Sequence, residues 1–381
     1  MRLRHAGIGL GAVAAMMSAA APALDFTLGI GPTYSCQSRG PGARIAALTF
    51  LEPAPVLSID DYGGRHYQPG DGENVGVGTG YADLTTPVGR YCVGVFYRTD
   101  YRGAASRDTL DALVANHNRQ PFDVGRTYKL EFASSYLDSA GVKLSRVFDF
   151  EPADRWSLQF GVTASVMKAL TYREAHLHGS AVATSGRYAV GTAALVRTES
   201  DYDAADFNSF VGTGDPQGYG YSFDAGFAMR APGGHTVTAT ILDAYSSLNW
   251  NGVPESIESI DNETVRYDTN LNREAFVAGR DRRVDLSHPM EPRYRLALSA
   301  PLQRGFSLFA SNDYVNHTHF PAMGLGYSWS GNYAELGFDI QTQAVGILFG
   351  RGWLRLAISS DDIQLSDASV LGVGLSIAGA W

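Results

Sequence analysis

Residues 371–381 read LGVGLSIAGAW and alternate between two kinds of side chain. The large apolar set is Leu371, Val373, Leu375, Ile377 and Trp381, and the small or polar set is Gly372, Gly374, Ser376, Ala378 and Ala380. Successive side chains of a β-strand point to opposite faces, so a period of two predicts a strand with one apolar face. The segment therefore predicts a β-strand that runs to the last residue.

The same alternation recurs at 127–136, 156–167, 219–230 and 333–343, and turns such as Pro232-Gly233-Gly234 separate the alternating segments. The predicted strands are about 10–13 residues long, whereas strands of globular proteins are usually about 5–6. A strand that crosses a bilayer needs about 9–11 residues. Hydrocarbon cannot satisfy backbone N–H and C=O groups, so a sheet that crosses it must close on itself. The pattern predicts an all-β fold, a transmembrane antiparallel β-barrel of about 12–16 strands, with about 14 as the central estimate.

Two segments interrupt the strand pattern. Residues 108–118 carry apolar side chains at helical spacing and predict a short loop helix or plug helix, with Asp108 as a possible N-cap. Residues 250–291 are rich in Glu, Asp, Asn and Arg and predict a long polar insertion. Either an extra strand lies within the insertion, near 262–269, or the strand count is off by one. The side of the membrane on which it lies stays open.

The N-terminal residues 1–23 have the pattern of a secretory signal peptide. Arg2 and Arg4 precede an apolar run of small residues, and Ala21-Pro22-Ala23 offers a small-x-small cleavage site. We expect cleavage near Ala23 and a single barrel domain over 24–381. An exported protein can form disulfides, so the two cysteines, Cys36 and Cys92, are a possible pair, and two free thiols are the alternative.

The composition excludes several classes of protein. The formal net charge is −9, which argues against nucleic-acid binding because nucleic-acid-binding domains usually carry a basic surface. Hydrophobic residues make up 45% of the chain and aromatic residues 11%, too much for a disordered chain. A β-rich exported or membrane protein remains.

Taken together, the signal peptide, the long alternating strands and the terminal aromatic residue resemble Gram-negative outer-membrane β-barrel proteins. The resemblance covers about residues 26–381 as a pattern. It implies a bacterial outer-membrane location, contact with outer-membrane lipid, and recognition of the last strand by the barrel-insertion machinery. Trp381 matches the terminal aromatic position, although most members end in Phe. The chain length is similar to that of the long-chain fatty-acid transporter group, but no motif specific to that group is present.

Charged residues on the less apolar strand faces are the main candidates for function. In a barrel these faces point into the lumen. The predicted lumen-facing residues are Arg98, Lys129, Glu131, Asp224, Arg230, Arg293, Arg295, Glu335, Asp339 and Arg355. They predict either a polar channel wall or paired charges that fill and stiffen the interior.

His178 and Ser180 are the only candidates for catalysis. Alternation places both side chains on one strand face, as a histidine base and a serine nucleophile require. That face is opposite the apolar one, so they are expected to point into the lumen, away from a lipid substrate. We expect no metal site, since His317 and His319 provide only two ligands, and no cofactor.

The expected function is a pore or transport route across the outer membrane. A structural or assembly component of a surface or secretion apparatus is the alternative. A barrel lipid hydrolase that uses His178 and Ser180 is a second alternative.

Overall fold

The computed structural model describes residues 42–52, 73–117, 120–152, 156–185, 188–201, 216–267, 273–315, 318–351, 354–362 and 370–378. These residues are almost entirely strand. The strands are β1 Gly42–Glu52, β2 Glu73–Val88, β3 Tyr91–Ser106, β4 Thr127–Phe150, β5 Ser157–Ser185, β6 Tyr188–Glu199, β7 Gln217–Arg230, β8 Thr236–Tyr267, β9 Arg273–His288, β10 Arg293–Pro301, β11 Phe306–Val315, β12 Thr318–Trp329, β13 Asn332–Asp339, β14 Val345–Arg351, β15 Leu354–Ser360 and β16 Val370–Ala378. The helix α1 spans Arg107–His117, and a 3₁₀ turn spans Gln303–Gly305.

All strands belong to one antiparallel sheet that closes into a barrel. Neighbours in sequence pair from β10 through β16, β16 pairs with β1, and pairing continues through β5, β7 and β8 back to β10. The strands β6 and β7 pair with successive parts of β5, and β9 and β10 pair with successive parts of β8. β6 and β7 together occupy one position in the ring, and so do β9 and β10. The sixteen strands of the described residues therefore give a ring of 14 positions. The predicted transmembrane β-barrel and its central estimate are therefore confirmed.

The outward face of the barrel is apolar, as the alternation predicts. Leu296, Leu308, Leu325, Leu336 and Ile347 are about half exposed, and their sequence neighbours point inward. A lipid-facing strand face has this composition, because hydrocarbon does not penalise exposed aliphatic side chains.

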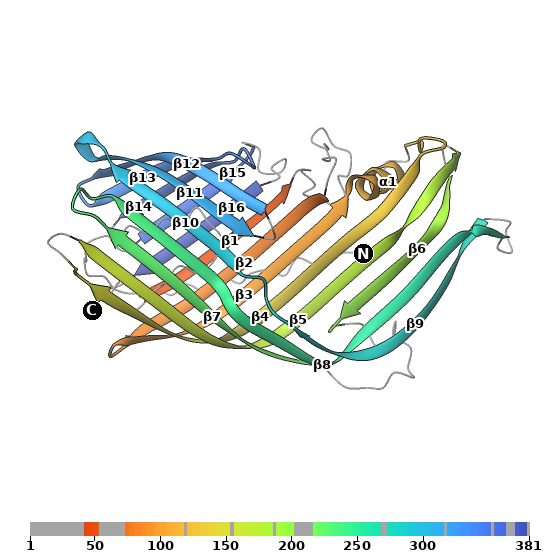
Figure 1. Ribbon diagram of the computed structural model, residues 1–381, viewed down its shortest axis with the longest axis horizontal. Coiled ribbons are helices and arrows are strands. Elements are labelled where there is room, and N and C mark those ends of the chain that lie inside the picture. Colours follow the sequence, from red (N-terminus) through yellow and green to blue (C-terminus); the bar gives the residue numbers. More distant parts are fainter. Residues whose placement is uncertain are drawn as a thin grey trace.

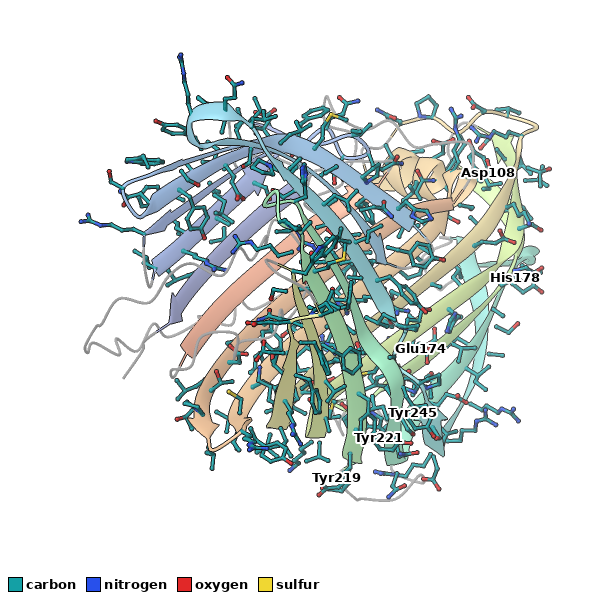
Figure 2. The ribbon with its side chains drawn as sticks, turned by 60° about the vertical axis from the view of Figure 1, so that its left-hand side comes forward. Asp108, Glu174, His178, Tyr219, Tyr221 and Tyr245 are labelled. Atoms are coloured by element: carbon teal, nitrogen blue, oxygen red, sulfur yellow. The ribbon has the colours of Figure 1, made fainter. Side chains whose placement is uncertain are left out.

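Aromatic residues border the outward apolar band at both ends. At one border the rings of Tyr221 and Tyr245 lie 5.8 Å apart (Figure 2). The rings of Tyr294 and Tyr314 are also 5.8 Å apart. At the other border, Phe306 and Tyr327 lie 4.6 Å apart, and a chain of ring contacts continues through Trp329 and Phe349. Such girdles mark the two membrane interfaces.

Large inward side chains lie over glycines of the adjacent strand. A Cβ at Gly218 would sit 2.6 Å from the ring of Trp250, and one at Gly324 would sit 2.4 Å from the ring of Phe309. These glycines remove the side chain that would push each ring toward the barrel axis. The rings therefore lie against the wall itself.

The barrel wall is far taller on one side than on the other. β5 has 29 residues and β8 has 32, whereas β14 and β15 have 7 each. A bilayer needs only about 9–11 residues per strand, so the excess projects beyond it. Gly42 pairs with Ala378, so β1 begins and β16 ends at one end of the barrel, and the tall side projects at the opposite end. Figure 1 shows β6, β9 and α1 at this projecting end.

The projecting part is called the upper sheet and consists of residues 127–137, 171–185, 188–199, 253–267 and 273–288. The predicted polar insertion at 250–291 lies largely within it and is not an irregular loop. β8 continues to Tyr267 and β9 follows from Arg273. The polar composition arises because both faces of this sheet contact water rather than lipid. β9 pairs only with β8 among the described residues, and its exposed edge carries Arg280 and Arg282, which oppose edge-to-edge aggregation.

The predicted helix at 108–118 is confirmed as α1, but its N-cap is Ser106 rather than Asp108. Ser106 Oγ accepts a hydrogen bond from Thr109 N at 3.2 Å. Asp108 lies in the first turn, where it accepts hydrogen bonds from Arg126 at 2.6 Å and from the backbone N–H of Lys129 at 3.0 Å. The helix is therefore fastened to β4.

Three predicted features fall on residues outside the described ranges: the signal peptide 1–23, Cys36 and Trp381. Cys92 lies in β3 with its side chain inside the barrel, and it is disulfide-bonded. Its predicted pairing with Cys36 stays a prediction.

Candidate functional site: the barrel lumen

Charged side chains on β3 connect opposite sides of the barrel wall. Arg98 donates two hydrogen bonds to Asp243 of β8, at 2.9 and 2.6 Å. Asp100 accepts from Arg293 of β10, and Arg102 contacts Glu291 at 2.7 Å. In the ring, β4, β5 and β7 lie between β3 and β8 on the shorter path, so these three contacts cross the interior. They are called the cross-lumen ion pairs.

Two of the cross-lumen ion pairs are largely buried, whereas Arg102 and Glu291 are 24% and 39% exposed. The side chains of Arg98 and Asp243 are 10% and 0% exposed, and those of Arg293 and Asp100 are 9% and 13% exposed. Asp224, another predicted lumen residue, lies beside them and accepts a hydrogen bond from the backbone N–H of Asp243 at 2.8 Å. Charges buried to this extent and paired this closely are not the lining of a wide water channel at this level.

A second set of predicted lumen residues lies on the short strands. Arg295 and Asp313 form an ion pair at 3.7 Å with both side chains buried. Glu335 is also buried, and the guanidinium of Arg355 lies 5.9 Å from the ring of Tyr333. Lys143 of β4 and Asp83 of β2 form a buried ion pair that the sequence analysis did not identify.

Four predicted lumen residues do not lie in the closed part of the interior. Lys129 and Glu131 form an exposed ion pair at 2.7 Å on the upper sheet. Asp339 accepts hydrogen bonds from the backbone N–H groups at 341 and 342 and orders the turn after β13. Arg230 is exposed at the end of β7. Their side chains are accessible to water.

An apolar layer fills the lumen at the level where the two interrupted strands break, and sequence reasoning missed it. Its buried members come from β2, β3, β4, β5, β8 and the link before β10: Tyr81, Phe96, Leu137, Met167, Ala169, Tyr172, Leu248, Trp250, Val253 and Met290. Ser246 Oγ fixes the link by bonding both the N–H and the C=O of Met290, at 2.9 and 3.1 Å. The register places Tyr81, Ala169 and Trp250 in one cross-strand row with Arg98 and Ser139. Phe96, Met167 and Leu248 lie in the adjacent row of the inward face, through Gly141 and Gly220.

One signal in the sequence points to the apolar layer. Some inward-facing strand positions carry large apolar residues, whereas the barrel pattern predicts small or polar residues there. Bulges hid it, because they shift the alternation. β4 and β5 change register between Asp138 and Ser139, and β7 and β8 do so between Phe223 and Ala225.

A second apolar contact joins β2 to strands on the opposite, shorter side. Val77 of β2 packs with Val315 of β11, Phe320 of β12 and Ala344, and all four side chains are buried. Inward residues of β2 therefore meet the rim of the short wall. Together with the apolar layer, this contact narrows the lumen.

His178 and Ser180 lie on the inward face of the upper sheet, as predicted, and both are exposed. His178 Nδ1 is 3.9 Å from Glu131 Oε1, and no hydrogen bond joins His178 to Ser180 within the described part of the chain. His176 contacts Glu174 at 2.9 Å on the same face. The described residues hold no group of three His, Cys, Asp or Glu side chains that could bind a metal ion.

Ion pairs lie at both ends of the upper sheet, at Arg173 near its base and at Arg126 near its far end. Arg173 donates a hydrogen bond to Asp201 from Nε at 2.9 Å, and this bond lowers the pKa of Asp201. Hydrogen bonds to Asp108 and Asp111 raise the pKa of Arg126. Both contacts fasten the connections at the projecting end.

No protein-family model and no curated protein sequence match this chain. Among solved structures, it is similar to the toluene transporter TodX of Pseudomonas putida, with 9% identity, 91% of both chains covered and a TM-score of 0.27. It is also similar to the toluene transporter TbuX of Ralstonia pickettii, with 9% identity, 90% of this chain and 89% of that chain covered, and a TM-score of 0.25. A Pseudomonas aeruginosa FadL homologue matches with 10% identity, 89% and 88% coverage and a TM-score of 0.23.

The closed ring, its outward apolar band and its two aromatic girdles identify the fold as a transmembrane β-barrel. None of the described helices is long and apolar enough to cross a membrane.

Proposed function

We propose that this barrel is a gated route for small, largely apolar solutes across the outer membrane. The observation that carries the proposal is the inward-facing apolar layer. Barrel interiors are usually polar, because they contact water. Here Phe96, Met167, Leu248 and Trp250 form an apolar zone inside a membrane barrel.

An open water-filled pore fits this interior less well. Arg98, Arg293 and Arg295 are all less than 10% exposed, whereas side chains that line a channel contact bulk water. A solute that displaces the apolar layer would exchange apolar contacts for apolar contacts, at little cost in hydrophobic free energy. Movement of the cross-lumen ion pairs would then open the path.

The proposed location follows from the sequence pattern and the barrel. The chain is exported, loses its signal peptide near Ala23, and enters the outer membrane through the barrel-insertion machinery, which reads the strand that ends in Trp381. In this orientation the upper sheet projects outward, since β1 begins and β16 ends on the periplasmic side.

Uptake by intact cells tests the transport proposal, because the lipopolysaccharide leaflet slows the entry of apolar solutes. Cells that carry the chain should accumulate radiolabelled ethylbenzene faster than cells that lack it. Purified protein in planar bilayers should show no large steady conductance. Equal uptake with and without the chain would reject transport, and a large steady conductance would favour an open pore.

Two methionines provide a matched pair that tests whether the path runs through the lumen. Met167 is inward and 5% exposed, whereas Met323 is on the lipid face and 51% exposed. Met167→Gln places an amide in the apolar layer and should slow uptake, whereas Met323→Gln should leave the rate per inserted barrel unchanged. Equal rates for both variants would exclude the lumen as the path.

The upper sheet favours a second candidate function, binding of a partner at the outer surface. Its face carries exposed polar residues, among them Lys129, Glu131, His176 and His178, and no part of it is needed to cross the membrane. Removal of the projecting β5–β6 hairpin tests this function. Unchanged solute uptake together with lost surface binding would assign the upper sheet to a partner. Among the described residues, no hydrogen bond joins His178 to Ser180, so the hydrolase alternative is not proposed.

A further inference from the structure

Trp250 is the one polar aromatic residue of the apolar layer whose polar group has no partner in the described chain. Tyr81 accepts a hydrogen bond from Lys143 at 3.1 Å, and Tyr172 donates one to Glu174 at 2.7 Å. The residue Trp250 is 1% exposed, and its indole Nε1 is fully buried without an acceptor.

An unpaired buried N–H is unfavourable, so its presence calls for an explanation. Most buried polar groups in proteins have hydrogen-bond partners, and a buried donor without one forfeits the bond it made with water. The chain could have avoided the loss with Phe or Leu at position 250, since the layer around it is apolar. The indole N–H of Trp250, rather than its ring, is therefore the feature that needs a functional explanation.

The ring of Trp250 is held in place by its neighbours. It lies over Gly218, where a Cβ would sit 2.6 Å from two ring atoms, and its centroid is 5.9 Å from that of Tyr172. Along the same cross-strand row, Ala169 and Ser139 follow Gly218 on the inward face. The Oγ of Ser139 is also buried and without a partner. This row thus combines small side chains with two polar groups that are free to bond.

We propose that Trp250 Nε1 is a specificity-determining donor that binds the acceptor oxygen of an otherwise apolar solute. The inference rests on the proposed transport function and names its solute class: small apolar molecules with one uncharged hydrogen-bond acceptor, such as an aryl ketone. The apolar layer takes the hydrocarbon part, and the indole N–H selects the oxygen. A solute without an acceptor gains only the apolar contacts.

The direct test follows the indole N–H signal of Trp250 by NMR in the full-length barrel in lipid nanodiscs. The chain has five tryptophans, and the Trp250→Phe variant identifies the signal by its loss. Acetophenone and ethylbenzene form the probe pair, because they differ by one carbonyl oxygen. Acetophenone should shift the signal downfield, as a new hydrogen bond requires, and ethylbenzene should not. A signal that moves equally with both probes, or with neither, overturns the inference.

Uptake provides the functional readout. Trp250→Phe keeps an aromatic ring and removes the donor, so it should slow acetophenone uptake about five-fold and change ethylbenzene uptake less than two-fold, since a net hydrogen bond is worth about this factor. Replacement of Trp250 by benzothienylalanine, which substitutes sulfur for the N–H at nearly the same shape, gives the same comparison if the Phe variant folds poorly. Equal loss for both probes overturns the inference.

The two proposals fail in distinguishable ways. If wild-type cells take up neither probe faster than cells without the chain, transport fails, while the NMR shift still reports whether Trp250 binds the ketone. If both probes enter quickly and Trp250→Phe changes neither rate, transport stands and the role of Trp250 is rejected.

Discussion

Loss of Arg98 should destabilise the barrel more than any comparable change on its surface. Arg98→Met removes both hydrogen bonds to Asp243 and one contact with Asp100, which lies 2.5 Å away. Asp243 then stays buried beside Asp224 without a compensating charge. Breaking a buried ion pair by removing one partner costs about 3–5 kcal/mol. With a urea m-value of about 2 kcal/mol/M, the unfolding midpoint should fall by about 2 M.

The assay is urea unfolding in lipid vesicles, followed by tryptophan fluorescence. The double variant R98M/D243N should recover part of the lost stability, because position 243 then carries a neutral amide instead of an unpaired carboxylate. Arg230→Met is the matched control, since Arg230 is exposed, and it should cost less than about 0.5 kcal/mol. If Arg98→Met and Arg230→Met shift the midpoint equally, the cross-lumen ion pairs do not hold the barrel closed.

Three further outcomes test the face assignment, the ring packing and the electrostatics of the upper sheet. Leu336→Arg, on the lipid face, should cost about 2–4 kcal/mol and lower insertion yield in vesicles, whereas Leu336→Phe should insert normally; equal yields would refute the assignment. Gly218→Ala should lower the unfolding midpoint, because its Cβ would meet the indole ring 2.6 Å away, whereas Gly80→Ala, with its nearest atom at 3.5 Å, should cost less; the reverse order would refute the packing. The hydrogen bond from Arg173 lowers the pKa of Asp201. Its contribution to stability is therefore fully present above the ordinary carboxyl pKa of about 4, and it is lost as the pH falls through the lowered pKa. The midpoint difference between wild type and Asp201→Asn should thus shrink toward zero at acid pH, and a constant difference would refute the coupling.

Much of the barrel could be predicted from sequence, because strand alternation is a local property. β13 shows this well: Leu336 and Phe338 are exposed on the outward face, and Glu335 points inward. The size of the ring, 14 positions, could also be predicted. The two interrupted positions could not, because β6 and β7, and likewise β9 and β10, look like separate strands unless their pairing with β5 and β8 is known.

The interior could not be predicted to the same extent, because its contacts join distant parts of the chain. Arg98 and Asp243 are 145 positions apart, and Asp243 reaches the lumen through a bulge with a positive φ of 55°. Alternation identified Arg98 as inward but gave no partner for it. The upper sheet was recognised only in part. Alternation at 127–136 identified the start of β4, whereas 250–291 carries polar and charged residues at consecutive positions, so β9 and the end of β8 were interpreted as an insertion.

The unequal height of the wall gives the molecule a front and a back within the plane of the membrane. A barrel with an even wall presents the same height on all sides. Here the wall is tall near β5 and β8 and short near β14 and β15. With the upper sheet in the proposed outward orientation, large molecules that approach from the β14 side would reach the rim directly, and those that approach from the β5 side would meet the tall wall first. Under the proposed transport function, sequence variation should therefore concentrate on the tall wall, while the low rim stays constrained by the solutes that pass over it.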